Sequence, residues 1–306
     1  MFKSIEEIQT AMEEARYIID RDTATVLYLS LKLGKPILVE GEAGVGKTEI
    51  AKVLAQILDT RLIRLQCYEG LDAATALYEW NYPKQILWMK QAEICATPRE
   101  EIGKEIFGPE FLIRRPLLEA LQANSGKPVV LLIDEIDRAD EEFEAFLLEV
   151  LSDFQISIPE IGTIQAEMRP HVILTSNRTR ELHDALKRRC LYHWIDYPSI
   201  EKETRIVLAK APQAKGILVH QVCAFMQRVR EKDFFKKPGI AETLDWIQAL
   251  MALGKEDLDA EAVRETLGCV FKYYEDLKQM EEAGIQTFLG LLPRKDDLTG
   301  SRLPCA

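Results

Sequence analysis

The sequence has few of the residues from which proteins build metal sites and redox centres. Its 306 residues include six cysteines and four histidines. The two nearest cysteines are Cys67 and Cys95, so no C-x-x-C pair is present to indicate a zinc site or a dithiol motif. We interpret the cysteines as reduced thiols, mostly small apolar core residues. The scattered histidines show no Ser-His-Asp or Cys-His arrangement, which leaves nucleophilic catalysis without support.

Long apolar runs and an excess of basic residues are also missing. No run approaches the roughly 20 apolar residues of a membrane-spanning helix. Residues 1–15 show an acidic, helical pattern instead of a signal peptide, so we expect a cytoplasmic protein. The chain has 39 Lys+Arg against 50 Asp+Glu, a net charge of −11. This balance argues against a general nucleic-acid-binding protein, which would need a basic surface.

Apolar residues make up 47% of the chain, and their distribution predicts two domains. Up to residue 198, short apolar runs alternate with helical patterns, which predicts a three-layer α/β domain with a parallel sheet. The expected strands are 36–41, 61–68, 128–135, 171–177 and 191–198, with a hairpin at about 154–167. An all-α domain is expected over 199–292, with helices at about 199–211, 216–232, 240–253 and 260–282. A loose tail is expected at 293–306.

Residues 41–48, GEAGVGKT, fit the phosphate-loop pattern G-x-x-x-x-G-K-[ST]. The glycines allow backbone N–H groups to curve around phosphate oxygens, and the following helix adds its positive end. Lys47 is expected to reach the β- and γ-phosphates, and Thr48 to ligate Mg²⁺. A plain glycine-rich turn is the alternative, but the expected strand and helix on either side favour a nucleotide site. The predicted nucleotide-binding residues are Gly41, Glu42, Ala43, Gly44, Val45, Gly46, Lys47, Thr48 and Glu49.

Polar residues follow two later strands. Asp134 ends the most apolar strand and is expected to hold Mg²⁺ together with Thr48, while Glu135 would orient and deprotonate the attacking water. Asn177 follows another strand and could hydrogen-bond the water or the γ-phosphate. Each residue alone is more often structural. In combination with the phosphate loop they predict hydrolysis of a nucleotide, with ATP and Mg²⁺ as cofactors.

A basic run, Lys187-Arg188-Arg189, precedes the last expected strand. In a single subunit such a run is usually a solvated surface. In a ring, an arginine here could reach the γ-phosphate bound by the neighbouring subunit and act as an arginine finger. We favour Arg189 for this role, with Arg188 as the alternate.

The order of these motifs resembles the AAA+ ATPases. GEAGVGKT, LLIDEIDRAD, the hairpin, LTSN and ALKRRCLYHWIDYP occur in the family's order. The stretch from Asp134 to Ala139 resembles the MoxR branch, with Asp137 where that branch more often has asparagine. Within the branch, residues 16–48 and 236–246 look most like the CoxD-type ATPases, maturation factors linked to carbon-monoxide dehydrogenase-type molybdenum enzymes.

This resemblance implies both fold and function. It implies a P-loop core over 1–198, a helical lid after it, a homo-oligomeric ring (a hexamer) and a chaperone that uses ATP hydrolysis to remodel or mature a client metalloenzyme. A von Willebrand factor A domain protein is the implied partner. Tyr17 and Ile18 match the adenine-contacting position, although packing residues would look the same. The alternatives are an AAA+ motor acting on nucleic acid and a nucleotide-dependent scaffold with little turnover.

Two segments leave questions open. Many lids of the family carry a second sensor arginine, but the corresponding stretch here, 236–242, has none. Lys236 or Lys237 would supply a point charge in place of a bidentate fork. The insert at about 68–90 is rich in aromatic residues that either pack in the core or face a client. They are Tyr68, Tyr78, Trp80, Tyr82 and Trp88.

Overall fold

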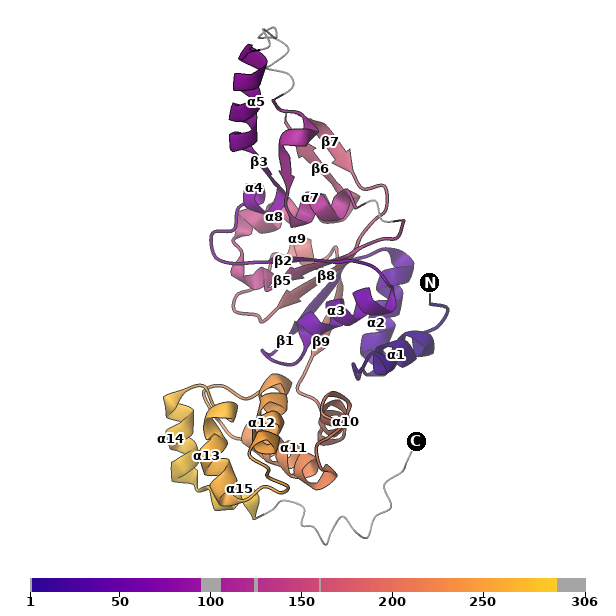
Figure 1. Ribbon diagram of the computed structural model, residues 1–306. Coiled ribbons are helices and arrows are strands. Elements are labelled where there is room, and N and C mark those ends of the chain that lie inside the picture. The colour runs from indigo at the N-terminus through magenta and orange to yellow at the C-terminus, as the bar shows by residue number, and fades with distance from the viewer. Residues whose placement is uncertain (1, 95–105, 124–125, 160, 291–306) are drawn as a thin grey trace. The chain divides into compact units, whose positions relative to one another are not determined.

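The computed structural model describes residues 2–94, 106–123, 126–159 and 161–290 (Figure 1). The chain divides into two compact units. Unit 1 contains Met1–Ala11, Asp20–Gly41 and Lys47–Trp194, and unit 2 contains Met12–Ile19, Glu42–Gly46 and Ile195–Ala306. The grouping of residues 12–19 and 42–46 with the C-terminal part was not expected from the sequence. It assigns most of the phosphate loop to the same unit as the C-terminal helices.

Unit 1 is built on a five-stranded sheet of order β2-β5-β8-β1-β9. The strands are β1 (Ile37–Gly41), β2 (Leu62–Gln66), β5 (Val130–Asp134), β8 (His171–Ser176) and β9 (Leu191–Ile195). Strand β5 pairs in parallel with β2 and β8, and β1 pairs in parallel with β8. Every residue of β1 and β5 is buried, because both faces of a parallel sheet are covered by other elements. The predicted α/β fold with a parallel sheet is confirmed.

Side chains alternate between the two faces of this sheet. Leu131 and Ile133 of β5 belong to a large buried core that also contains α7 (Pro116–Leu121), α8 (Glu141–Asp153) and the hairpin. Helix α3 (Lys47–Ile57) contacts β1, β2, β5 and β8, and its buried side chains lie outside that core, on the other face. Asp134 alternates with Ile133 and therefore shares the face of α3.

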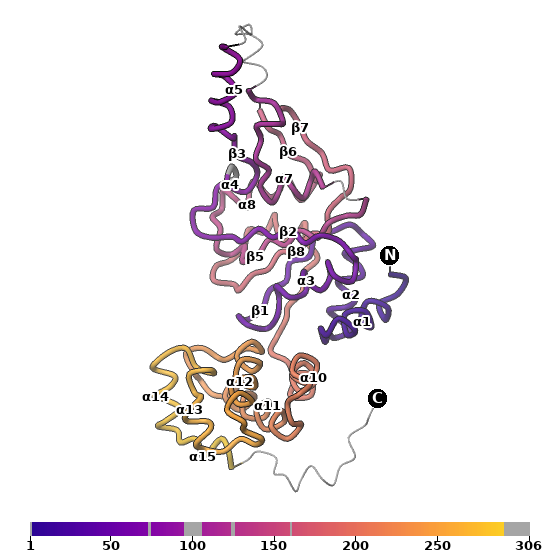
Figure 2. Tube along the Cα trace, in the orientation of Figure 1, coloured from indigo at the N-terminus to yellow at the C-terminus, as the bar shows by residue number. Residues whose placement is uncertain are grey.

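The remaining elements of unit 1 lie outside the five-stranded sheet. The hairpin consists of β6 (Gln155–Ile158) and β7 (Gly162–Gln165), and a two-stranded antiparallel sheet consists of β3 (Tyr78–Trp80) and β4 (Leu112–Arg114). Helix α5 (Tyr82–Ile94) extends beyond β3, away from the five-stranded sheet (Figure 2). Further elements are α2 (Arg21–Leu33), α4 (Ala73–Leu77), η1 (Pro109–Phe111), η2 (Ile136–Arg138) and α9 (Asp184–Lys187). Strands β3 and β4 were not predicted from the sequence, because a three-residue strand has no detectable period.

In the C-terminal part of unit 2, the described residues from 200 to 290 form helices joined by loops. Its helices are α10 (Ile200–Lys210), α11 (Gly216–Arg230), α12 (Ile240–Ala252), α13 (Ala260–Val270), α14 (Tyr274–Ala283) and α15 (Ile285–Leu289). The single helix expected over 260–282 is therefore wrong. Phe271 ends α13 in an extended conformation and packs on Phe234, with ring centroids 4.9 Å apart, so burial of this ring interrupts the helix. Helix α1 (Ile5–Glu14) precedes Tyr17. None of the helices in the described ranges is long and apolar enough to cross a bilayer.

Candidate nucleotide-binding site

The phosphate loop has the backbone that its glycines allow. Gly44 and Gly46 adopt φ angles of +77° and +96°, in the left-handed region that favours glycine. Helix α3 begins directly at Lys47, so its first N–H groups face the loop. Lys47 is buried, and its Nζ donates to the carbonyl O of Gly41 at 2.7 Å. The ammonium group is thus folded back over the loop, where phosphate oxygens would replace a carbonyl as its partner.

Asp134 lies at the centre of a group of donors at the end of β5. Its Oδ1 accepts from the hydroxyl of Thr48 at 3.0 Å and from that of Thr175 at 2.5 Å. Its Oδ2 accepts from the Arg64 guanidinium at 2.5 Å. Only 2% of Asp134 is exposed, so these three donors satisfy a carboxylate that water does not reach.

Thr48 and Asp134 fit a magnesium ion. They place a hydroxyl and a carboxylate oxygen, both hard ligands, 3.0 Å apart. Mg²⁺ typically binds through one or two such protein ligands and completes its shell with phosphates and water. The sequence expected both residues to take this role, and the structure brings them together.

Glu135 has an unusual backbone for a residue with a side chain. Its φ of 55° and ψ of 51° are left-handed, a conformation that costs roughly 1–2 kcal/mol for residues other than glycine. Its N–H donates to the Thr175 hydroxyl at 2.9 Å, and its Oε2 accepts from Gln66 Nε2 at 3.1 Å. Arg138 lies 3.5 Å from the same oxygen. The Glu135 side chain is 35% exposed, so this carboxylate, unlike that of Asp134, can meet a water molecule.

Asn177 follows β8 and is held by Asp137. The buried Asp137 carboxylate accepts from the backbone N–H groups of Asn177 at 3.2 Å and Thr179 at 2.9 Å, and from the Thr179 hydroxyl at 2.7 Å. The side-chain amide of Asn177 has no hydrogen-bond partner among the residues that the structure describes. Asp137 therefore fixes the loop that carries Asn177.

Three residues at this sheet edge were missed from the sequence. Arg64 and Gln66 alternate with the buried Ile63 and Leu65 along β2, so the polar half of that alternation was the available signal. Thr175 stands within an apolar run and has no comparable signal. All three become visible only through the register that pairs Gln66 with Asp134 and places β8 beside β5.

The Cys67 thiol is buried close to the carboxylates of this site, and both conditions affect its pKa. Burial, and to a smaller extent the charges of Asp134, Asp137 and Glu135, together raise the pKa of Cys67 to about 12. The thiol stays protonated at neutral pH and is no nucleophile. Cys67, Cys190, Cys223 and Cys269 are free cysteines, while Cys95 and Cys305 lie outside the described residues.

The predicted adenine-contacting residues and the predicted arginine fingers lie in different parts of the structure. The Tyr17 hydroxyl donates to the carbonyl O of Gly46 at 3.1 Å, and Ile18 is half-buried. Arg189 donates to the Ser152 hydroxyl at 2.5 Å and to the carbonyl O of Ala185 at 3.0 Å, within its own subunit. Arg188 is exposed, and its guanidinium has no bonding partner among the described residues.

The aromatic insert is divided between core and surface. Trp80 is buried at 8% exposure and packs edge-to-face on Tyr78 and Phe107, at centroid distances of 5.9 and 5.4 Å. Trp88 packs on Phe111 at 6.0 Å. Tyr82 and Tyr68 are exposed. Trp80 and Tyr82 therefore do not share one client-facing surface.

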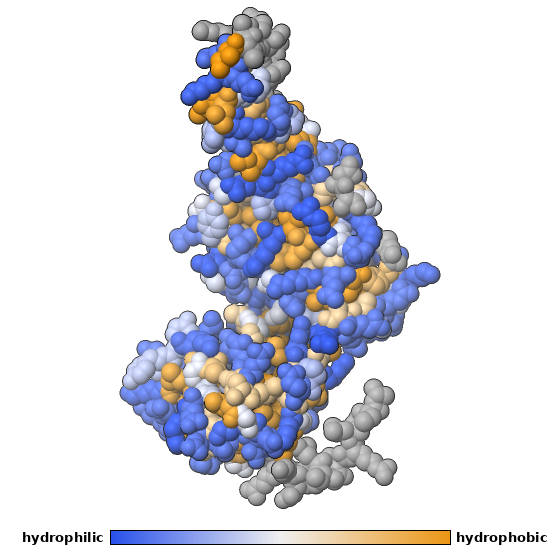
Figure 3. Space-filling model, viewed as in Figure 1, coloured by the Kyte–Doolittle hydropathy of each residue, from blue (hydrophilic) through white to orange (hydrophobic). Residues whose placement is uncertain are grey.

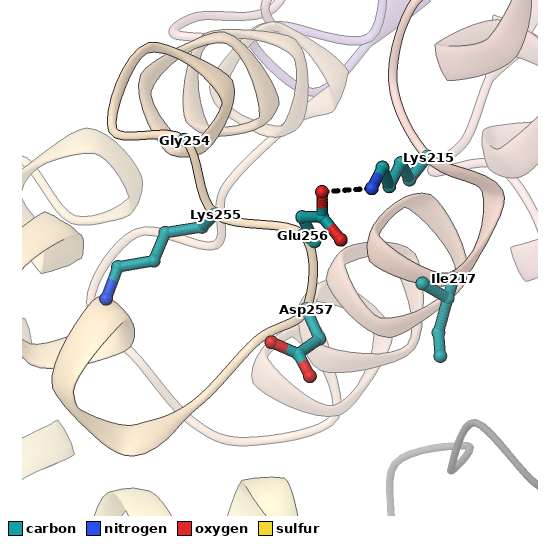
Figure 4. A pocket seen from close by; sticks show the side chains of 6 residues that line it. All are labelled: Lys215, Ile217, Gly254, Lys255, Glu256 and Asp257. Atoms are coloured by element: carbon teal, nitrogen blue, oxygen red, sulfur yellow. Dashed lines mark ion pairs between the residues drawn. The ribbon is translucent and has the colours of Figure 1, made fainter.

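Unit 2 also has a hollow between the segments that precede α11 and α13 (Figure 4). Its volume is about 430 Å³, and two of its lining residues, Lys215 and Glu256, form an ion pair. The lining residues are Lys215, Ile217, Gly254, Lys255, Glu256 and Asp257. None of them belongs to the phosphate loop or to the sheet edge.

Similar proteins include uncharacterized proteins from Staphylococcus aureus strains NCTC 8325 and COL. Each is 26% identical over 228 residues, which cover 72% of this chain and 77% of the relative. Among solved structures, the RuvB Holliday junction branch migration motor of Thermotoga maritima is 17% identical with a TM-score of 0.45. That match covers 87% of this chain and 72% of RuvB.

A family model matches more than half of the chain. The match runs over residues 36–190 and has the description AAA domain (dynein-related subfamily). It spans the strands of the five-stranded sheet up to the start of β9. It also contains the phosphate loop, Asp134, Glu135, Asn177 and both candidate arginines. The chain therefore belongs to the dynein-related subfamily of the AAA domain family.

Proposed function

We propose that the protein is a Mg²⁺-dependent ATPase that works in a ring as a MoxR-type chaperone. The observation that carries this proposal is the meeting of Thr48, Asp134 and Glu135 at one edge of the sheet. Two of them supply hard oxygen ligands beside the phosphate loop, and the third supplies an accessible carboxylate. This combination suits phosphoryl transfer to water.

Each side chain has a separate task in that reaction. The Lys47 ammonium exchanges the Gly41 carbonyl for β- and γ-phosphate oxygens and neutralises their charge. Thr48 and Asp134 hold the magnesium ion, which supplies charge compensation when bound. Glu135 accepts a proton from the water whose oxygen forms a bond to the γ-phosphorus, while the bond to the ADP oxygen breaks. Asn177 orients this water or a γ-phosphate oxygen.

Two substitutions test the assignment. Lys47→Ala should abolish ATP binding, because the phosphate charge then lacks its buried counter-charge. Glu135→Gln should keep binding but slow phosphate release by about 10²–10⁴-fold, because an amide does not accept the proton. Equilibrium binding of a fluorescent ATP analogue and phosphate release measure the two steps separately. A Glu135→Gln protein that hydrolyses ATP at the wild-type rate would show that another group is the base.

The ring is supported by the basic run at 187–189 and by the guanidinium of Arg188, which has no partner within the described part of the chain. An arginine finger acts in trans, so Arg188→Ala and Arg189→Ala are each combined with Glu135→Gln subunits. The finger variant should be inactive alone and regain activity in mixed rings, because some interfaces pair an intact Glu135 with an intact finger. We keep Arg189 as the first candidate, although its bonds to Ser152 and Ala185 would have to break. If neither variant is rescued in mixed rings confirmed by mass, the in-trans finger is wrong.

A client-maturation role is supported by the CoxD-type resemblance and by the surface of α5. This helix exposes Tyr82, Ile86, Leu87 and Ile94, and Figure 3 shows hydrophobic residues on the surface of the α5 region. The proposed client is a metalloenzyme of the molybdenum, carbon-monoxide dehydrogenase type, with a von Willebrand factor A domain protein as partner. Deleting the gene should lower the metal content and activity of that enzyme while leaving its abundance unchanged. Full metal content after deletion would contradict the role.

A further inference from the structure

Within unit 2, the N-terminus of α12 is bonded to the phosphate loop. The N–H groups of Ile240 and Ala241 both donate to the carbonyl O of Gly44, at 3.0 and 3.2 Å. The first N–H groups of a helix have no partner inside the helix, and a side chain at the N-cap usually accepts from one of them. The N-cap of α12 is Gly239, which has no side chain. The carbonyl O of Gly44 therefore accepts the hydrogen bonds that an N-cap side chain would otherwise accept.

Gly239 is the residue that permits this approach. A Cβ at this position would lie 2.8 Å from the carbonyl O of Ala43, 2.8 Å from the carbonyl C of Gly44 and 2.9 Å from its Cα. All three are backbone atoms, which cannot rotate away as the end of a side chain can. The φ of Gly239 is −87°, so the requirement for glycine is steric contact with the loop and not its own backbone conformation.

A buried ion pair positions the turn that holds Gly239. Arg230 forms a two-pronged bond with Glu203, at 2.6 and 2.7 Å, and both side chains are at most 5% exposed. The Arg230 Nε also donates to the carbonyl O of Pro238 at 2.7 Å. This guanidinium therefore ties α10 and α11 to the residue just before the N-cap. Arg230 acts on the phosphate loop through the turn, as a positioning residue.

The contact also orients a phosphate-binding group. A trans peptide unit is planar, so its C=O and N–H point in opposite directions. Because α12 holds the carbonyl O of Gly44, the N–H of Val45 in the same peptide unit must point away from α12. An N–H held in this way is pre-oriented for an oxygen of the ligand, and it gives up no freedom when the ligand binds.

We propose that nucleotide affinity depends on this backbone contact between α12 and Gly44, which replaces the side-chain contact of a sensor arginine. The proposal rests on the proposed nucleotide site and names how the helical unit acts on it. It requires no basic side chain at positions 236–242. It assigns Gly239 a role in the site and Arg230 a role in placing Gly239.

The experiment compares Gly239→Ala with Gly216→Ala. Gly216 also lies at the start of a helix of unit 2, and a Cβ there meets nothing within 4 Å. A fluorescent ADP analogue with Mg²⁺ measures affinity without hydrolysis. Gly239→Ala should raise its Kd about tenfold or more, the effect of losing one hydrogen bond to a charged ligand, whereas Gly216→Ala should leave the Kd within about twofold of wild type. Wild-type affinity for Gly239→Ala would overturn the proposal.

Amide-resolved hydrogen exchange of the wild-type protein gives a second test that needs no variant. The amides of Ile240 and Ala241 should be protected without nucleotide, since both are hydrogen-bonded. Exchange at the rate of unbonded amides would overturn the proposal even if Gly239→Ala does not fold. Nucleotide binding without hydrolysis would contradict the proposed ATPase function alone. A wild-type protein that binds no nucleotide would contradict both.

Discussion

Replacing Trp80 separates the core of the insert from its surface. Trp80 is 8% exposed and packs edge-to-face on two rings, whereas Tyr82, two residues along the chain, is 60% exposed. Truncating a buried tryptophan to alanine typically lowers the free energy of unfolding by about 3–5 kcal/mol. Truncating an exposed residue usually changes it by no more than about 0.5 kcal/mol. The two single variants should therefore differ by several kcal/mol, although both remove an aromatic ring.

Thermal melting is the assay. For domains of about 150–250 residues, each kcal/mol shifts the melting temperature by roughly 2–4 °C, so Trp80→Ala should melt about 6–20 °C below wild type. Tyr82→Ala should melt within about 2 °C of wild type. Trp80→Phe serves as the control, because it keeps a ring opposite Tyr78 and Phe107 and should recover most of the loss. If Trp80→Ala melts with wild type, the packing described for this insert is wrong.

Two further predictions concern the sheet edge. Asp137→Ala should slow phosphate release about tenfold or more, because the loop of Asn177 loses three hydrogen bonds. The Kd for an ADP analogue should stay near wild type, because the phosphate loop loses none. An equal loss of nucleotide affinity would indicate general misfolding instead. The raised pKa of Cys67, about 12 against 9.0 for an unburied thiol, means that its stabilising contribution is complete below pH 9 and lost as the pH rises toward 12. Urea titrations of wild type and Cys67→Ala across that pH range measure the free energy of unfolding of each protein. If both lose the same free energy between pH 9 and 12, ionisation of Cys67 is not the cause of the loss.

Much of the fold follows from the sequence, because burial on both faces leaves a strong signature. Strand β1 begins with the apolar run Ile-Leu-Val and β5 with Val-Leu-Leu-Ile, and every residue of both strands is buried. Strands β3 and β4 have three residues each, too few for any period to show. The break after α13 depends on Phe271 meeting Phe234, a contact between residues far apart in the chain. Local patterns do not encode such contacts, so a single long helix was the natural prediction.

The candidate site divides in the same way. Lys47, Thr48, Asp134 and Glu135 are recognisable because their chemistry needs those residue types at fixed spacing within one segment. The residues that hold them in place come from other strands. Thr175 of β8, for example, bonds both the Asp134 carboxylate and the Glu135 N–H. Their identity is loosely constrained, since any short donor at that register position would serve. Only the order β2-β5-β8 of the sheet places these residues together.

A contact made by the backbone leaves the weakest trace in a sequence, and α12 shows where that trace can still be found. An exposed helix start is usually capped by Ser, Thr, Asp or Asn, since their side chains accept from the first N–H groups. Pro238-Gly239 precedes α12 and provides no such acceptor. The lack of a local acceptor for the first N–H groups of α12 is itself the signal of a contact with another segment, because buried N–H groups are almost always paired. A helix in a compact unit that begins at glycine must take its acceptor from elsewhere, and here that acceptor is the carbonyl O of Gly44.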